Sequence, residues 1–210
     1  MTKTTSFLRI EEYKRLSKVS LTGRVLDIGG SQKSGYHELL KGSHEITTAN
    51  IDAEYGADLI FDAEATWPIE DSSYDAILFI NVLEHLYQPQ RAMGEASRAL
   101  VPGGRIIGVV PFMFNVHASP NDFFRYTKSA LERMLADSGF SQIQVEELGT
   151  GAFSVVYHAV FAVIRWRWLA AILRGACRGL DTFLARMKPG NRMSAEYMPL
   201  GYYFEAVKTD

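Results

Sequence analysis

Polar side chains follow four apolar runs of the sequence that are typical of β-strands. Asp27 ends the first run together with two glycines, Gly29 and Gly30, and Asp52 ends the second run. A carboxylate beside such glycines would repel a pyrophosphate but attract a cationic amine or a sulfonium. An acidic side chain at the end of a second strand suits the two hydroxyls of a ribose. These residue types favour a nucleoside ligand that carries a cationic group.

The third and fourth runs continue the pattern. Asp62 and Ala63 follow the third run, where they suit an adenine ring, and Asn81 follows the fourth. Ligands of open α/β sheets lie outside the carboxyl ends of the strands. Each residue alone has a plain alternative, either a tight strand-to-helix turn or a solvated aspartate in a loop. Four successive strand ends that all carry one are a stronger indication than any single motif.

These residues need a sheet to bring them together, and the sequence predicts one. Short apolar runs, which suit strands buried on both faces, lie at 24–28, 45–51, 58–61, 74–80, 105–110 and 143–148. Stretches with helical spacing separate them at 34–41, 88–100 and 128–137, with Pro102-Gly103-Gly104 expected to stop the second helix. We predict a Rossmann-like α/β fold with seven strands in a mostly parallel sheet and helices on both faces. The last strand, 202–208, is expected to be reversed, after a helical insertion at about 152–193.

Composition narrows the function classes. The chain has 210 residues, 47% of them hydrophobic, and a formal net charge of −2. This indicates one domain (core 22–148 plus 202–208) and argues against a strongly basic nucleic-acid binder. The single Cys177 excludes an intramolecular disulfide, and we expect no metal-ligand cluster. The first residues lack the apolar region of a signal peptide, so we expect a cytoplasmic protein.

The motifs, taken in order, resemble a known family. VLDIGG, NID, FDAEATWPIEDSSYDAILFINVLEHLYQP and LVPGGRIIGVVPF follow one another between residues 22 and 148. This order is similar to that of class I S-adenosylmethionine-dependent methyltransferases, in particular the small-molecule group called type 11. The resemblance implies S-adenosylmethionine as cofactor. Ser31 stands where the family usually has a further glycine, which indicates a loop remodelled around Gly35.

The resemblance also implies roles for the residues at the strand ends. Asp27, Gly29 and Gly30 would flank the methionine part of the cofactor, and the backbone at Asn81 would hold its end. Asp52 would bind the ribose hydroxyls, beside Ala53. Asp62 and Ala63 would contact adenine.

An acceptor atom that carries a proton loses it on methylation, so the protein needs a base to take that proton. Histidine suits this role near neutral pH. We predict His117 as base or hydrogen-bond donor, with His85 as the second candidate. His117 belongs to a loop similar to one seen in some methyltransferases near sugar and cell-surface biosynthesis. In that loop Asp122, Arg125 and Tyr126 are expected to contact substrate; alternatively, Asp122 and Arg125 pair with each other and hold the loop. His37 and His44 are expected at the surface.

The insertion is both apolar and basic. Residues 153–193 carry +6 and the rest of the chain −8. At helical spacing Arg167, Arg174, Arg178 and Asp181 share one narrow face, opposite a broad apolar face that includes Trp166, Ile172 and Phe183. Three interpretations stay open: a helical lid packed on its own domain, a peripheral contact of 153–187 with the inner face of a membrane, and a homodimer interface.

We therefore expect an S-adenosylmethionine-dependent methyltransferase that acts on a small-molecule or glycan- or lipid-linked acceptor, without nucleic acid as a partner. The alternative is a catalytically inactive protein of the same fold that docks on a membrane or partner through the insertion.

Overall fold

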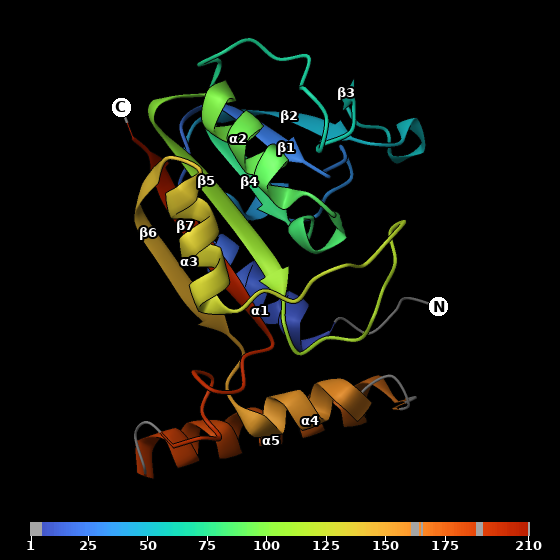
Figure 1. The fold of residues 1–210 in the computed structure, drawn as a ribbon. Helices are drawn as coiled ribbons and strands as arrows, with labels where there is room; N and C mark the ends of the chain where they lie inside the picture. The colour runs from blue at the N-terminus through green and yellow to red at the C-terminus, as the bar shows by residue number, and fades with distance from the viewer. Residues whose placement is uncertain (1–5, 161–163, 165, 188–190, 210) are drawn as a thin grey trace.

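A twisted sheet of seven strands forms the centre of the protein (Figure 1). The computed structural model describes residues 6–160, 164, 166–187 and 191–209. The strands stand in the order β3-β2-β1-β4-β5-β7-β6. Their bounds are β1 Gly23–Ile28, β2 His44–Asn50, β3 Leu59–Ile60, β4 Tyr74–Ile80, β5 Leu100–Pro111, β6 Phe140–Leu148 and β7 Gly201–Lys208. The first five are parallel, and β7 runs antiparallel between β5 and β6, which confirms the predicted fold class.

Helices cover both faces of the sheet because the central strands are apolar on both sides. On β4, Ile77 and Phe79 point into one core, where α2 (Pro89–Ala99) and α3 (Lys128–Asp137) pack. Leu78 points into the other core, which α1 (Phe7–Leu16) covers together with Tyr157 of the insertion. Because helices cover both faces, a ligand can reach the sheet at the edge where the parallel strands end.

Three local expectations differ from the structure. Residues 34–41 form no α-helix but a single 3-10 turn, His37–Leu39, because the chain there folds back beneath β1. Pro102-Gly103-Gly104 does not lie between elements but inside β5, where the pairing with β4 shifts register. The helix α1 was not anticipated from the sequence.

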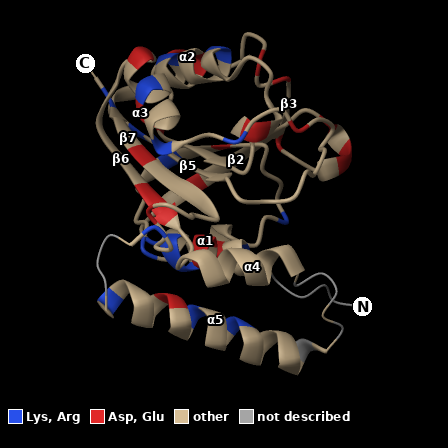
Figure 2. Cartoon of the chain, turned by 60° about the horizontal axis from the view of Figure 1, so that its bottom comes forward, with Lys and Arg blue, Asp and Glu red and all other residues tan. Residues whose placement is uncertain are grey.

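The insertion forms two helices, α4 (Ala152–Val160) and α5 (Arg167–Met187), that lie side by side at one end of the sheet (Figures 1 and 2). They connect β6 to β7, as predicted. Among the described residues, no helix combines the length and the apolar character needed to cross a membrane.

Candidate active site

A cleft of about 890 Å³ opens at the carboxyl ends of β1 to β4. The turns that follow these four strands form its floor, and the segment 118–123 beyond β5 forms one side. A volume of this size suits a nucleoside-sized ligand. Its position at the strand ends is the usual ligand site of an open α/β sheet.

Most of the residues predicted to bind the cofactor line this cleft: Gly29, Asp52, Ala53, Asp62, Ala63 and Asn81. Asp52 and Asp62 each use one carboxylate oxygen to accept a backbone N–H two residues onward. These local hydrogen bonds fix the two turns and aim the carboxylates at the cleft. Fold and side-chain placement thus agree with the sequence-based prediction for this group.

Asp27 and Gly30 do not line the cleft. The Asp27 carboxylate is fully buried, and it accepts a hydrogen bond from the Tyr36 hydroxyl and meets His37 Nε2, both at 2.7 Å. The expectation that His37 lies at the surface is therefore wrong, because a buried carboxylate needs polar partners and the turn at residues 36–39 supplies them. A Cβ on Gly30 would lie 1.9 Å from Asp27 Oδ2, so only glycine fits there. Asp27 therefore packs against the glycine turn at Gly30 and does not face the cleft.

Backbone geometry explains two further positions. Gly29 has a φ of +75°, and a Cβ there would lie 2.4 Å from Val82, so the turn after β1 requires glycine. Asn81 ends β4 with a φ of +56°, a conformation that asparagine tolerates better than most residues. Its side-chain amide donates to the buried Glu12 of α1 at 3.2 Å. The resulting bend carries the chain from β4 into the wall of the cleft.

The loop after Gly30 is held by hydrogen bonds between Ser31 and Ser34, and its remodelling around Gly35 stays a prediction. The Ser31 N–H donates to Ser34 Oγ at 3.0 Å, and the Ser34 N–H donates to the Ser31 carbonyl at 2.9 Å. Asn50, whose role the sequence did not reveal, donates its side-chain amide to the carbonyls of Gly29 and Gly30. These bonds hold the glycine turn although the usual further glycine is missing.

The cleft is acidic and apolar. Asp52, Asp62 and Glu64 contribute carboxylates, and no lysine or arginine is found among its described lining residues. The aromatic rings of Tyr87 and Phe123 stand 5.3 Å apart at its side, both substantially exposed. Such a site attracts a cation on an apolar body and repels phosphates.

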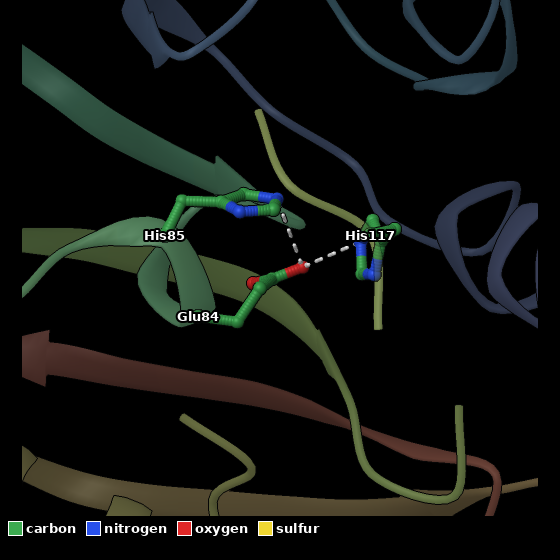
Figure 3. Close-up of side chains that lie close together, drawn as sticks. All are labelled: Glu84, His85 and His117. Carbon is green, nitrogen blue, oxygen red and sulfur yellow. Dashed lines mark ion pairs between the residues drawn. The ribbon is translucent and has the colours of Figure 1, made fainter. Parts of the chain in front are cut away.

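A glutamate and two histidines meet beside the cleft (Figure 3). Glu84 is fully buried, and its Oε1 lies 3.8 Å from Nε2 of His85 and 3.8 Å from Nε2 of His117. His85 lines the cleft, whereas His117 does not, and the His117 side chain is 37% exposed. The three groups therefore connect the cleft to solvent. Glu84 was not predicted; its position beside His85 in the sequence was the only signal available.

Backbone carbonyls set the protonation of both rings. His85 Nδ1 lies 2.5 Å from the Asn121 carbonyl, and His117 Nδ1 lies 3.1 Å from the Asn115 carbonyl. A carbonyl only accepts a hydrogen bond, so Nδ1 is the donor nitrogen of each ring. In the neutral form of His85, Nε2 is therefore unprotonated and faces Glu84. Apart from its own backbone N–H, Glu84 has no hydrogen-bond donor among the described residues.

Burial favours the protonated form of Glu84 and the neutral form of His85. It raises the pKa of Glu84 to about 8, against weaker opposition from its own backbone N–H and from Arg125. It lowers the pKa of His85, against the hydrogen bond to the Asn121 carbonyl. At neutral pH the carboxyl is mostly protonated and His85 neutral. The arrangement is therefore that of a base backed by a proton-holding carboxyl group.

The same three groups form a potential ligand set, since one atom from each lies within 4.8 Å of the others. Two ligands at about 2.1 Å from one tetrahedral or octahedral ion stand roughly 3.0–3.4 Å apart. The 3.8 Å separations would have to contract for a metal ion. A hydrogen bond from a protonated Glu84 to either Nε2 would also require these separations to shorten. The expected absence of a metal site stays a prediction.

The residues predicted to contact substrate do not line the cleft. Asp122 accepts two hydrogen bonds from Arg125, which hold the pKa of Asp122 well below its usual range. Asp122 also accepts the His117 backbone N–H at 2.8 Å. Tyr126 is buried and donates to the Leu83 carbonyl at 3.0 Å. These contacts fit the alternative in which Asp122 and Arg125 hold the loop, and they place His117 over Glu84.

Comparison with known proteins agrees with this geometry. Residues 26–108 match a family model described as a methyltransferase domain. The match covers less than half of the chain, and the strand order with the reversed β7 is that of the Rossmann-like fold expected from the sequence. Residues 26–108 are thus similar to a methyltransferase domain.

Solved methyltransferase structures share the fold of this chain. A possible histamine N-methyltransferase from Thermotoga maritima is 17% identical, with a TM-score of 0.61 over 97% of this chain and 90% of that one. Phosphoethanolamine N-methyltransferase 2 from Haemonchus contortus, solved with S-adenosylmethionine, is 16% identical, with a TM-score of 0.58 over 94% of this chain and 51% of that one. Identities this low establish the fold alone.

One curated relative shares part of the sequence. A 37.1 kDa protein in a transposon of Streptomyces fradiae is 35% identical over 89 residues, which is 42% of this chain. The chain spans 23% of that protein's length, and the match shows similarity over this segment alone.

Replacing Glu84 tests the buried carboxyl beside the cleft. Because its pKa is higher in the folded than in the unfolded state, the wild type loses stability as the pH rises from about 4.5 to about 8. Glu84→Gln should remove this loss and raise the free energy of unfolding at pH 8.5 by roughly 3–5 kcal/mol, with little difference near pH 4.5. Urea unfolding at both pH values measures it. Glu132→Gln, at an exposed position of α3, should behave like the wild type. An unchanged pH dependence in Glu84→Gln would refute a buried, protonated Glu84.

Proposed function

We propose that this protein is an S-adenosylmethionine-dependent methyltransferase acting on a small-molecule or glycan- or lipid-linked acceptor. The observation that carries the proposal is the convergence of residues from the ends of four successive strands on one acidic, cation-free cleft. Structural relatives support it, since one of them was solved with this cofactor bound.

The residues of the cleft fit the cofactor. In the proposal Asp52 accepts the ribose hydroxyls, and Asp62 and Ala63 contact adenine; all three line the cleft. The turn at Gly29 lets the backbone approach closely because no Cβ intervenes. When bound, S-adenosylmethionine supplies a methyl group on a sulfonium, so an acceptor that carries a proton must release it to the protein.

His85 is the residue that takes this proton in our proposal. It lines the cleft, its Nε2 is unprotonated in the neutral ring, and burial keeps that ring neutral. Glu84, which holds a proton at neutral pH, gives that proton to the partly exposed His117 and takes up the proton from His85, and His117 releases its proton to solvent. Each transfer requires the 3.8 Å separation to shorten to hydrogen-bond distance. Sequence reasoning ranked His117 before His85; the proposal keeps both, with His85 in the cleft and His117 at the exit.

An acceptor screen tests the proposed activity. Purified protein and S-adenosylmethionine are incubated with hydroxyl, amine and glycan acceptors, and S-adenosylhomocysteine release is measured with and without EDTA. We expect release with at least one acceptor class and no loss of rate in EDTA. Cofactor binding without turnover on any acceptor would favour the inactive alternative, and loss of rate in EDTA would favour a metal at Glu84, His85 and His117.

A further inference from the structure

The helix α5 turns its apolar face outward. Trp168, Ile172, Phe183 and Met187 are 58–70% exposed, and we call these four residues the apolar stripe of α5. Leu173 and Leu180 flank the stripe and are also exposed. On neighbouring α4, Val156 and Val160 are exposed as well. Large apolar side chains gathered in this way usually mark a surface that contacts a partner or a membrane.

Polar contacts fix this orientation. The Asp181 side chain of α5 is buried and accepts hydrogen bonds from Thr150 Oγ1 and from the backbone N–H groups of Phe153 and Ser154, each at 2.9 Å. Arg178, on the same side of α5, forms an ion pair with Glu11 of α1 at 3.0 Å. Rotating the helix to bury the stripe would break all these contacts. The predicted polar face of α5 thus faces the protein, while the side chain of Arg167 lies outside the described residues.

The charges around the stripe identify what covers it. Between residues 153 and 193 the sequence has seven arginines and lysines and one acid, Asp181, which is buried. Arg186 in the last turn of α5 and Arg192 shortly after it are exposed, and the exposed Trp166 and Trp168 stand at the start of the helix. A second copy of this face would bring arginine against arginine without an acid to pair. An anionic lipid surface provides the opposite charge and an apolar layer, and tryptophan suits its interface.

We infer that α4 and α5 bind in the plane of an anionic membrane, with the apolar stripe of α5 inserted among the lipids. The cleft lies close to this layer. His158 of α4 stacks on Phe114 with 4.6 Å between ring centres, and Phe114 contacts the His117 ring at 5.1 Å. The inward side of α4 is thus linked by ring contacts to the loop whose continuation, 118–123, forms one side of the cleft. The inference does not depend on the proposed methyl transfer.

Vesicle sedimentation tests the inference with the full chain. We expect binding to vesicles of phosphatidylcholine with 30% phosphatidylglycerol and at least tenfold weaker binding to phosphatidylcholine alone. Ile172→Glu/Phe183→Glu should lower the partition coefficient at least tenfold, with an unchanged or higher melting temperature because both positions are exposed. Arg186→Glu/Arg192→Glu should also weaken binding, whereas the matched Arg91→Glu/Arg133→Glu change on α2 and α3 should weaken it much less.

Two results would overturn the inference. One is equal sedimentation of the wild type and the Ile172→Glu/Phe183→Glu variant, which includes the case in which neither binds. The other is a stable dimer in light scattering that Phe183→Glu dissociates, since a second copy would then cover the stripe.

Discussion

His85→Ala is expected to lower kcat for methyl transfer by about 10²–10⁴-fold, the usual contribution of a general base. The ring is the described imidazole that lines the cleft, and its unprotonated Nε2 is fixed by the Nδ1 contact to the Asn121 carbonyl. Because the pKa of His85 is lowered, the wild-type rate should reach its plateau at a lower pH than an ordinary imidazole would allow. Steady-state kinetics between pH 5 and 8 measure both effects.

Two further variants distinguish the base from the residue that releases the proton to solvent. His117→Ala leaves His85 in the cleft and should cost less, about tenfold, because water can still remove the proton from Glu84. His44→Ala, on β2 and away from the cleft, should leave kcat unchanged. A normal kcat for His85→Ala would show that no base in this position is needed, and a larger loss for His117→Ala would restore His117 as the base.

Asp52→Ala is expected to weaken S-adenosylhomocysteine binding by about 10–100-fold. The carboxylate is the acidic group at the end of β2, and hydrogen bonds to a charged acceptor contribute about 1.5–3 kcal/mol. Equilibrium titration of the two proteins measures the ratio. Glu54→Ala removes the same charge two residues away without touching the lining of the cleft, and it should bind like the wild type. Equal weakening in both variants would indicate a general charge effect and no specific contact at Asp52.

The strand ends show what the sequence could predict. Alternation of short apolar runs and helical stretches determines the order and direction of the strands, and the parallel strands must end at one edge. Asp52, Asp62 and Asn81 therefore reached the same cleft without any knowledge of contacts. Asp27 follows the same sequence pattern, but it lies inside β1 and not beyond its end. Successive residues of a strand point to opposite faces of the sheet, so the Asp27 side chain points away from the side to which Ile28 points.

The side-chain network beside the cleft could not be predicted. In the sequence Glu84 resembles an acidic residue in the first turn of a helix. It is buried in the structure, where the loop at 117–126 folds back beside it. The Asp122–Arg125 pair was foreseen as an alternative, but that it supports His117 above Glu84 depends on tertiary contacts. The direction of α5 was also beyond the sequence. Helical spacing separates its polar and apolar faces, but only the buried Asp181 and the Arg178–Glu11 pair show that the polar face points inward.

Titration calorimetry of the wild-type protein with S-adenosylhomocysteine tests the central claim most directly. The account predicts saturable binding of one molecule per chain, driven by a cleft that is already formed. No binding at millimolar ligand, with the protein folded as judged by its cooperative unfolding, would contradict the assignment of the cleft at Asp52, Asp62 and Asn81 as the cofactor site.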